Sequence, residues 1–552
     1  VKTALDMITS GNMVPAAKAK AAGIVDEIVD DLVDGACAFA EKLAADGAPL
    51  NVISAGRGKL DEAEAGIFDE YRKKMGRSAR GFLAPQNCIA AVEAAVTSAD
   101  FDSGLARERE LFGELMASPQ RAAQIHVFFG ERETAKIPDV PKDIKPRPIK
   151  SAGIIGCGTM GGGIAMNFAN AGIPVKVLEM SQEAIDRGMG IIRKNYENTM
   201  KKGRLTQEQV DQRLSMFSTT MDYADLGDAD IVVEAVFEEM SIKQEVFGKL
   251  DKVMKPGAIL ASNTSTLDID AIANATSRPE DVVGTHFFSP ANVMRLLENV
   301  RGEKTAKDVI ATVMALGKKI GKVPVLAGNC DGFIGNRMLD KYIRQAQFLV
   351  EEGAQPEDVD RVVFDFGFAM GPFAMSDLAG NDVSWFIRKR KLENWPQGKR
   401  YCSLPDKVCE LGRFGQKTGD GWYHYEAGDR TPHPDPVIKE LIEKHSAEAG
   451  MKRREISDDE ILERCIFALV NEGAKILEEG IAIRPVDIDI TYNYGYAFPR
   501  YWGGPMHYAD HVGLDKVLDR IRHYHEQSGD DEWKPAPLIE KLVAEGKGFK
   551  DL

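Results

Sequence analysis

A glycine-rich turn is the first feature of the chain whose residue types and spacing could do chemistry. The turn reads Gly156-Cys157-Gly158-Thr159-Met160-Gly161. It follows a short apolar run and precedes a helical pattern. In such a turn Gly156 permits the tight bend, Gly158 lets the backbone approach a pyrophosphate, and Gly161 lets helix and strand pack closely. The amide groups at the helix start would face the phosphates. The turn, with Thr159 inside it, therefore predicts a dinucleotide site.

A carboxylate stands where this site would need one. Glu179 follows the next strand-like run, Val175-Lys176-Val177-Leu178. An acidic residue about 20 positions after the turn accepts hydrogen bonds from the adenosine ribose hydroxyls. Because a carboxylate there repels a 2′-phosphate, Glu179 favours NAD over NADP; the plainer interpretation is a solvated strand end.

One histidine is placed for acid–base chemistry. A dehydrogenase that oxidises an alcohol needs a base with a pKa near neutrality, and histidine suits that task. His286 follows the strand-like residues 282–285, so it would lie at the edge of the sheet where ligands bind in such folds. Taken alone, a histidine in this position is more often structural.

Two further features favour a catalytic role for His286. The run Ser262-Asn263-Thr264-Ser265-Thr266 follows another strand and would bring hydroxyls to the same edge. Glu298 follows His286 in the next segment, and a carboxylate that binds one ring nitrogen fixes the tautomer and stabilises the imidazolium. The spacing by itself does not show that the two side chains touch.

The elements that must position these residues alternate in type. Apolar runs at residues 149–155, 175–178, 231–233 and 258–261 alternate with helical stretches, which predicts a Rossmann-type doubly wound parallel sheet. Residues 1–135 look mainly helical, with one strand-like piece at 23–29. Prolines 138, 141, 146 and 148 mark a stiff linker.

Helices dominate after Gly332, and they contain an internal repeat. Residues 348–353 (Phe-Leu-Val-Glu-Glu-Gly) resemble residues 475–480 (Lys-Ile-Leu-Glu-Glu-Gly), and a Gly-Pro pair follows each copy. The second copy lacks a Gly-Phe-Ile-x-Asn-Arg run, so we expect a structural shell without an active site of its own. The predicted domains are residues 1–148, 149–328, 329–428 and 429–552.

Composition narrows the function classes. A formal net charge of −15 argues against a general nucleic-acid binder, although a local site could still take an anionic ligand. No segment approaches the roughly 18 consecutive apolar residues of a membrane span. The seven cysteines form no Cys-x-x-Cys pair and only nine histidines occur, so we expect no metal site. Scattered cysteines suggest reduced thiols and a cytoplasmic location.

The motifs together resemble one family. The glycine-rich turn, Ser262 to Ser265, the run His286-Phe287-Phe288-Ser289-Pro290, Glu298 and residues 332–337 (Gly-Phe-Ile-Gly-Asn-Arg) occur in this order. Over residues 149–426 they resemble the L-3-hydroxyacyl-CoA dehydrogenase family. Residues 414–421 resemble the motif that closes that family's helical domain. The doubled helical domain and the preceding segment resemble the multifunctional fatty-acid β-oxidation proteins, which carry an enoyl-CoA hydratase/isomerase domain in front of the dehydrogenase.

The resemblance implies roles for particular residues. His286 would be the acid/base that acts with Glu298 when the 3-hydroxyl of an acyl-CoA is oxidised with NAD. Ser265 and Asn336 would hold the substrate near the nicotinamide, with Ser265 touching both ligands. A substrate contact at Tyr494 is weighed against a plain packing tyrosine. The cofactor contacts would include Met160, Glu179, Glu238, Lys243 and Lys417.

One departure from the family concerns Ser289, where many members have asparagine. Serine still forms hydrogen bonds but has a shorter reach, so the nicotinamide contact at Ser289 is in question. A thiolase is a candidate partner of such a protein.

The front segment resembles the end of a crotonase-type hydratase/isomerase domain, with residues 128–132 similar to its linking helix. That family's catalytic glutamates and oxyanion-hole glycines would lie upstream, so we expect a fragment of a longer protein that cannot hydrate an enoyl-CoA. An unrelated helical domain is the alternative.

Two other functions stay open. Other β-hydroxyacid dehydrogenases share a similar turn and a helical domain but use a catalytic lysine, and activity on free hydroxy acids would favour them. An NAD-binding scaffold with a silent site is the non-enzyme alternative, and NAD binding without turnover would favour it.

Overall fold

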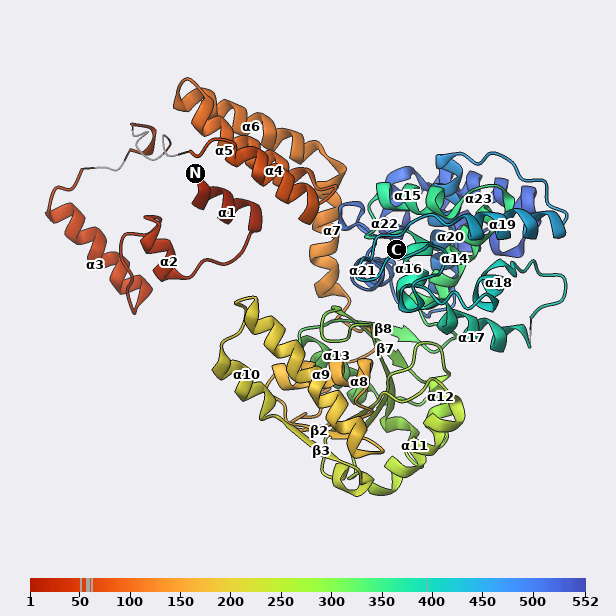
Figure 1. Ribbon diagram of the computed structural model, residues 1–552. Helices are drawn as coiled ribbons and strands as arrows, with labels where there is room; N and C mark the ends of the chain where they lie inside the picture. The colour runs from red at the N-terminus through yellow and green to blue at the C-terminus, as the bar shows by residue number, and fades with distance from the viewer. Residues whose placement is uncertain (50–51, 56–59, 61–62, 394) are drawn as a thin grey trace. The chain divides into compact units, whose positions relative to one another are not determined.

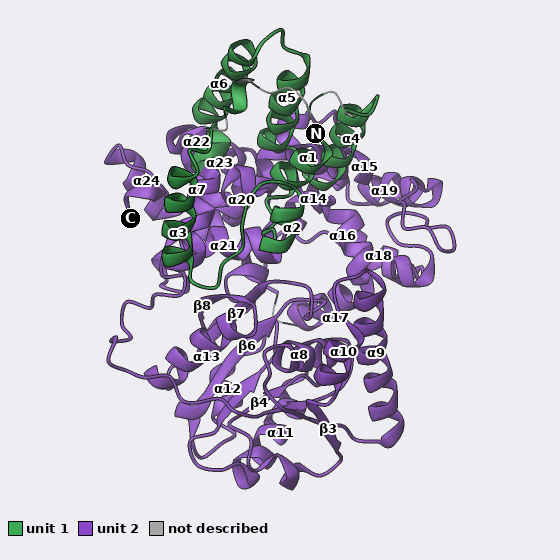
Figure 2. Ribbon diagram, turned by 90° about the vertical axis from the view of Figure 1, so that its left-hand side faces the viewer, with its two compact units in different colours: residues 1–122 green, residues 123–552 purple. Residues whose placement is uncertain are grey.

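The computed structural model describes residues 1–49, 52–55, 60, 63–393 and 395–552. The chain forms two compact units, Val1–Ala122 and Ala123–Leu552 (Figure 2). Within the described ranges, no helix is long and apolar enough to cross a membrane. The domain limits expected from the sequence stay predictions, since the compact units separate only between Ala122 and Ala123.

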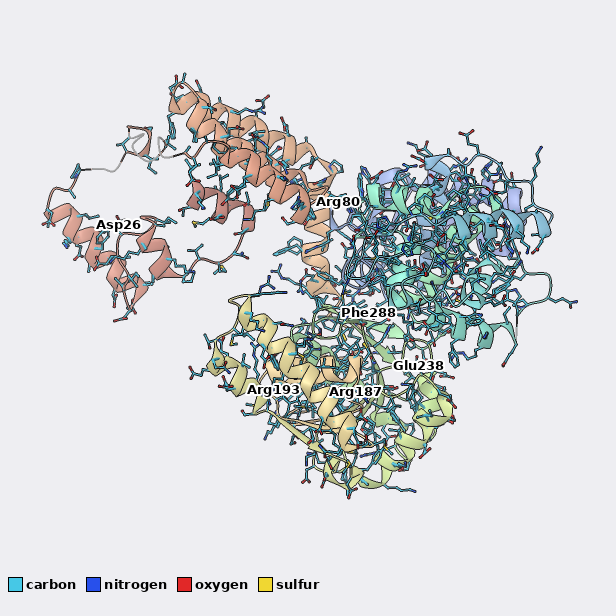
Figure 3. The ribbon with its side chains drawn as sticks, viewed as in Figure 1. Asp26, Arg80, Arg187, Arg193, Glu238 and Phe288 are labelled. Carbon is cyan, nitrogen blue, oxygen red and sulfur yellow. The ribbon has the colours of Figure 1, made fainter. Side chains whose placement is uncertain are left out.

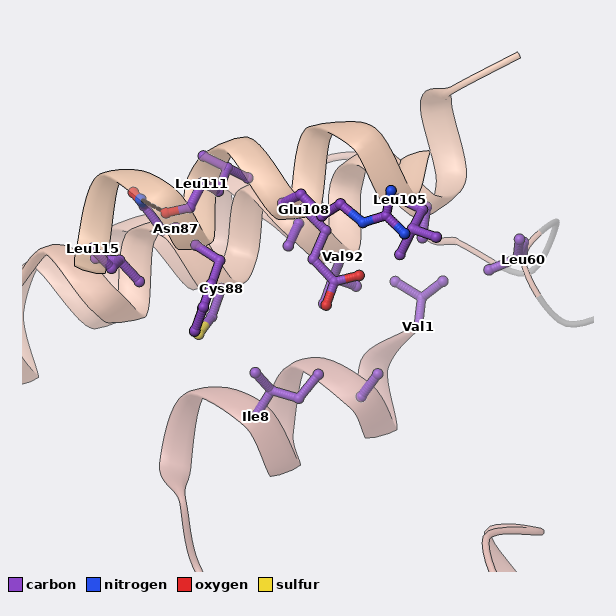
Figure 4. Close-up of a pocket in the computed structure, with 15 residues that line it drawn as sticks. Val1, Ile8, Leu60, Asn87, Cys88, Val92, Leu105, Glu108, Leu111 and Leu115 are labelled. Carbon is purple, nitrogen blue, oxygen red and sulfur yellow. Dashed lines mark hydrogen bonds between the residues drawn. The ribbon is translucent and has the colours of Figure 1, made fainter. Parts of the chain in front are cut away.

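The first unit is helical. Its helices are α1 (Lys2–Ser10), α2 (Ala16–Ala21), α3 (Leu32–Ala45), α4 (Ile67–Ser78), α5 (Leu83–Thr97) and α6 (Phe101–Ala117). A groove of about 540 Å³ lies between α1, α5 and α6, and apolar side chains such as Ile8, Val92 and Leu111 line it (Figure 4). The strand expected at residues 23–29 was wrong: this segment forms turns and coil, and Val25 and Ile28 are exposed. A lone strand has no partner for its backbone groups.

The second unit begins within helix α7 (Pro119–Glu133) and contains an eight-stranded sheet (Figure 1). The sheet order is β3-β2-β1-β4-β5-β6-β7-β8, which confirms the predicted doubly wound fold. The strands are β1 (Ala152–Ile155), β2 (Val175–Leu178), β3 (Phe217–Thr220), β4 (Ile231–Glu234), β5 (Ile259–Ser262), β6 (Val282–Phe287), β7 (Leu296–Arg301) and β8 (Val323–Gly328).

Alternating side chains of the central strands fill two apolar layers. Ile154, Val177 and Val233 pack with the helices on one face, whereas Ile155 and Val232 belong to the cluster on the other. Central strands that are buried on both faces are mostly apolar, as here, although β4 ends in the buried Glu234 and β5 in the buried Ser262. The helices around the sheet are α8 (Thr159–Asn170), α9 (Gln182–Lys201), α10 (Gln207–Leu214), α11 (Met240–Val253), α12 (Ile269–Ala273) and α13 (Lys307–Lys319).

The sheet departs from the expected all-parallel arrangement at one edge. Strand β7 runs antiparallel to β6, and β8 runs parallel to β7. The sequence did not reveal β7, because its residues 296–301 mix apolar and polar types without alternation. The reversal places His286 of β6 directly opposite Glu298 of β7.

Two helical copies follow the sheet. The first has α14 (Gly335–Glu352), α15 (Pro356–Phe366), α16 (Pro372–Ala379), α17 (Asn381–Leu392) and α18 (Leu404–Glu410). Helix α19 (Pro436–Glu448) leads to the second, with α20 (Asp458–Glu478), α21 (Pro485–Gly495), α22 (Pro505–Val512), α23 (Leu514–Ser528) and α24 (Pro537–Ala544). Helices α14 and α20 pack against each other.

Equivalent aspartates show the internal repeat in atomic detail. Asp360 of α15 accepts hydrogen bonds from the first amides of α16, and Asp489 of α21 does the same for α22. Asp377 of α16 then accepts the amides of residues 422–423, as Asp510 of α22 accepts those of residues 549–550. Asp360, Asp377 and Asp489 are buried and Asp510 is half-buried, and each carboxylate satisfies backbone donors at the same place in both copies.

Candidate active site

The glycine-rich turn joins β1 to α8, as predicted. Gly156 has φ 95°, and a Cβ on it would lie 2.7 Å from the carbonyl oxygen of Ala235, which follows β4. A Cβ on Gly161 would overlap the carbonyl oxygen of Gly156. By contrast, a Cβ on Gly158, the N-cap of α8, would meet nothing within 4 Å. The open space at the helix start therefore fits a dinucleotide phosphate, whereas Gly156 and Gly161 are required by the turn itself.

Glu179 lies beside this turn. Its Oε1 accepts a hydrogen bond of 2.6 Å from the Cys157 amide, and its Oε2 accepts one of 3.1 Å from the Met180 amide. The carboxylate at the end of β2 is thus held next to the turn, where an adenosine ribose would lie. Thr159 is exposed and Met160 is half-buried in the first turn of α8.

His286 and Glu298 are in direct contact. Nδ1 of His286 lies 2.8 Å from Oε2 of Glu298, and the side chains are 8% and 0% exposed. The ring of His286 packs on Phe288, with 4.3 Å between the ring centroids. Because Nδ1 is occupied by the carboxylate, Nε2 is the nitrogen left for a substrate proton.

Glu298 also fixes the start of the helical domain. Its Oε1 accepts hydrogen bonds from the backbone amides of Ile334 (2.9 Å) and Gly335 (3.2 Å) at the N-terminus of α14. One carboxylate therefore orients the imidazole and anchors the helix that carries Asn336.

Ser265 is positioned by an acidic partner. Its amide and its hydroxyl both donate to Oε1 of Glu238, at 2.7 and 2.9 Å, and the hydroxyl of Thr264 donates to the same oxygen. Burial alone would raise the pKa of Glu238, but Lys243 and these hydrogen bonds outweigh it and lower the pKa. Glu238 is labelled in Figure 3 at the edge of the α/β part.

Lys243 lies underneath this cluster. Its ammonium group is fully buried and donates to both carboxylate oxygens of Glu234, at 2.8 and 3.0 Å, and to the carbonyl oxygen of Asn263. In this conformation Lys243 supports the loop that carries Ser265 and exposes no surface to a ligand. A direct cofactor contact by Lys243 stays a prediction.

Asn336 meets Ser265 across the border between the α/β part and the helices. Its Nδ2 donates a 3.1 Å hydrogen bond to the carbonyl oxygen of Ser265. Its Oδ1 accepts a 2.8 Å hydrogen bond from the hydroxyl of Tyr496, which belongs to the second helical copy. Burial and the nearby Glu298 raise the pKa of Tyr496 well above its usual value, so the hydroxyl keeps the proton it donates.

The sequence pointed to Tyr494 rather than Tyr496. The guanidinium groups of Arg295 and Arg500 lie 4.8 and 5.2 Å from the centre of the Tyr494 ring. A substrate contact by Tyr494 stays a prediction. Nothing in the alternating tyrosines at 492, 494 and 496 marks which one reaches the site, because that depends on where α21 ends.

Two other residues, Ser289 and Lys417, were predicted to contact the cofactor, and those contacts stay predictions. Ser289 is exposed, in the loop after β6, and precedes a cis proline. Lys417 is half-exposed in the first helical copy, where its ammonium pairs with Asp382 at 2.5 Å. The described structure does not bring Lys417 to the glycine-rich turn, and its cofactor contact stays a prediction.

A cavity of about 500 Å³ opens beside Ser265, Ser289 and Asn336. Apolar side chains of α14 and α17 line it, and cationic side chains stand among them. The apolar residues are Leu339, Ile343, Val383 and Ile387, the cationic ones are Arg337, Arg344, Arg388 and Lys391, and Asp331 and Asp340 are acidic. Each of these four cations is paired with a carboxylate. Phe288, labelled in Figure 3, lines this cavity, and its ring packs on that of His286.

One group of potential metal ligands occurs among the described residues: Glu351, Cys402 and His445, all buried. Glu351 already binds the guanidinium of Arg400 at 2.6 Å and Nε2 of His445 at 2.8 Å. Burial raises the pKa of Cys402, which keeps its thiol protonated. The charge of Glu351 is thus compensated without a metal ion, and the group serves as a structural network.

Comparison with known proteins agrees with this geometry. The model of the 3-hydroxyacyl-CoA dehydrogenase NAD-binding domain matches residues 151–330, and the model of the C-terminal domain matches residues 332–425 and again 461–550. The second match confirms the predicted duplication.

Similar whole proteins support the same grouping. A peroxisomal bifunctional enzyme of Danio rerio is 44% identical over 99% of this chain and 78% of its own length. The dehydrogenase part of multifunctional enzyme 1 from C. elegans is 30% identical, covers 76% of this chain and 96% of its own, and has a TM-score of 0.57. A 3-hydroxybutyryl-CoA dehydrogenase from Escherichia coli is 26% identical over 72% of this chain and 98% of its own, with a TM-score of 0.63. The chain therefore belongs to the 3-hydroxyacyl-CoA dehydrogenase family, among the multifunctional β-oxidation proteins.

Proposed function

We propose that the chain oxidises the 3-hydroxyl of L-3-hydroxyacyl-CoA to a ketone with NAD, with His286 as the acid/base and Glu298 as its partner. The observation that carries the proposal is the contact of 2.8 Å between His286 Nδ1 and Glu298 Oε2, at the border between the dinucleotide fold and the helical cavity.

The chain's own residues divide the work. Nε2 of His286 accepts the proton of the 3-hydroxyl, and Glu298 stabilises the resulting imidazolium. Ser265 and Asn336 hold the oxygen of the reacting carbon near Nε2. NAD, when bound at the glycine-rich turn, supplies the hydride acceptor.

The cavity suits an acyl-CoA. Its apolar side chains on α14 and α17 match the acyl chain of such a substrate. Asn336 and Arg337 both line this cavity, so a substrate bound in it would reach Asn336 without crossing the glycine-rich turn.

The assignment is tested with purified protein, NAD and 3-hydroxybutyryl-CoA, where formation of NADH is followed by absorbance at the nicotinamide band. His286→Ala should lower kcat by at least about 100-fold, since general acid–base catalysis contributes roughly 10²–10⁴-fold. The affinity for NADH should change little, because His286 lies away from the phosphate turn. Near-full activity in this variant would contradict the assigned role.

The alternative lysine-based dehydrogenases make a different prediction, namely turnover of free hydroxy acids but not of CoA esters. Lys243, the buried lysine near Ser265, donates to Glu234 and exposes no surface to a substrate, which speaks against them. A silent scaffold would bind NAD without turnover of any 3-hydroxyacyl-CoA.

Compartment and partner are part of the proposal. The name of the Danio rerio relative places that protein in peroxisomes, so we propose a peroxisomal location rather than the cytoplasmic one expected from the cysteines. Fluorescence microscopy of the tagged full-length protein tests this. A thiolase would consume the 3-ketoacyl-CoA product, and co-sedimentation with a thiolase tests a stable complex.

A further inference from the structure

The side-chain amide of Asn336 has one orientation that satisfies both of its neighbours. The carbonyl oxygen of Ser265 can only accept a hydrogen bond, so the amide atom that faces it must be Nδ2. Oδ1 therefore faces the hydroxyl of Tyr496, which must donate. Without the Tyr496 hydroxyl, the hydrogen bond to the Ser265 carbonyl would be the one remaining interaction of these two that fixes the orientation of the Asn336 amide.

The ring of Tyr496 is closely seated. It lies against the first turn of α14, where a Cβ added to Gly335 would overlap the Tyr496 ring. The neighbouring Tyr492 stacks on Tyr496 with 4.8 Å between ring centroids and donates its hydroxyl to the carbonyl oxygen of Gly335. Position 335 thus has to be glycine for the hydroxyl of Tyr496 to reach Asn336.

The same ring contacts the other side of the site. Tyr496 packs edge-on against Phe288, with 5.4 Å between centroids, and Phe288 packs on His286. A Cβ on Gly495 would come within 2.5 Å of Cδ2 of Leu296 and within 3.3 Å of the Phe288 ring, so the segment packs closely against this side of the site. The segment 492–496 therefore touches both the substrate-holding amide and the aromatic support of the acid/base.

We infer that Tyr496 of the second helical copy is a positioning residue for the dehydrogenase reaction, which holds the Asn336 amide in the orientation that the substrate requires. The inference rests on the proposed function. The second copy, expected from the sequence to be a structural shell, then contributes a residue to the site of the first.

The test compares Tyr496→Phe, which keeps the ring and removes the hydroxyl, with Tyr508→Phe. Tyr508 lies in the same copy, where its ring packs on Phe366, away from Asn336. Steady-state rates with NAD and 3-hydroxybutyryl-CoA are measured for both variants, for Asn336→Ala, and for the double variant. NADH affinity and the thermal midpoint are measured in parallel.

Tyr496→Phe should lower kcat/KM about tenfold, the effect of losing one well-formed hydrogen bond. Tyr508→Phe should stay within about twofold of the wild type. In the Asn336→Ala background the Tyr496→Phe change should have no further effect, because the amide it positions is absent.

Four results would overturn the inference: unchanged kcat/KM in Tyr496→Phe, an equal further loss in the Asn336→Ala background, loss of NADH binding, or loss of the folded state. The last result would show that the hydroxyl holds the fold rather than the amide. A wild type without turnover would overturn the proposed function and this inference together, whereas an active wild type with an unaffected Tyr496→Phe variant would overturn the inference alone.

Discussion

At the scale of single residues, Glu298 has two functions that a substitution can separate. Oε1 receives the amides of α14 and Oε2 receives Nδ1 of His286. In Glu298→Gln the side-chain oxygen can still accept the backbone amides, which directs the NH₂ group at His286. Nδ1 must then accept, so the proton moves to Nε2 and the ring can no longer act as a base.

We expect Glu298→Gln to lower kcat by at least about 100-fold, as a tautomer reversal does in other catalytic histidine–carboxylate pairs. NADH affinity and the thermal midpoint should remain close to those of the wild type. Rates and NADH fluorescence titrations check this. A Gln variant with more than half of the wild-type kcat would show that Glu298 acts on α14 alone.

The sequence predicted which residues form the site wherever a motif contained them. It did not predict which of these side chains touch one another. His286, Glu298 and Ser265 were found from their types and their places after strands, yet the sequence spacing left their distance open. The antiparallel pairing of β6 with β7 decides that distance. Tyr496 was missed because its role depends on the end of α21, a tertiary detail.

At the scale of elements, the strand–turn–helix unit predicts opposite outcomes for two of its glycines. Gly158 has φ −73° and open space around its missing Cβ, so Gly158→Ala should fold normally. Its methyl group would occupy the space next to the helix amides and should weaken NADH binding at least about tenfold.

Gly161→Ala provides the contrast, because its Cβ would overlap the Gly156 carbonyl oxygen. This variant should lose stability, by about 1–3 kcal/mol as expected for overpacking. Urea unfolding and NADH titration distinguish the two variants. Normal NADH affinity in Gly158→Ala would show that the phosphates bind elsewhere.

Most strands of the sheet could be predicted from the sequence, except those that lack a run of buried apolar residues. Short runs of buried β-branched residues revealed β1, β2, β4 and β5, whereas the half-exposed β3 and the polar-containing β7 lacked that signal. The strand expected at 23–29 had the right composition but no partner. Local sequence does not report whether a partner exists.

At the scale of the whole molecule, the two helical copies bind each other reciprocally. Arg337 of α14 donates to Glu472 of α20 and to Glu479, which caps the C-terminus of α20. Arg464 of α20 donates to Gln345 and Glu352 of α14. The same difference in residue number relates Arg337 to Arg464, Gln345 to Glu472 and Glu352 to Glu479. Arg464 is therefore the counterpart of Arg337.

This register explains why one copy is catalytic. The residue before Arg337 is Asn336, and the residue before Arg464 is Glu463, which instead binds Arg520 and Tyr524. The second copy kept the arginine that joins the copies and lost the amide that serves the substrate. The equivalence of Arg464 and Arg337 was not visible in the sequence, because the second copy lacks the rest of the Gly-Phe-Ile-x-Asn-Arg motif.

The two arginines therefore predict different effects on stability and on activity. Arg464→Ala leaves Glu352 and Gln345 without this partner and should lower the free energy of unfolding by about 1–3 kcal/mol. Its kcat/KM, measured below the unfolding transition, should stay within about twofold of the wild type, because Glu463 and its neighbours touch no part of the site.

Arg337→Ala should lose similar stability, since Glu472 is nearly buried, and should also lower kcat/KM about tenfold because Asn336 is adjacent. Urea unfolding and steady-state kinetics of both variants provide the check. An equal loss of kcat/KM in the two variants would show that the copies transmit any disturbance of their interface to the site, and that the arginine beside Asn336 has no special share in catalysis.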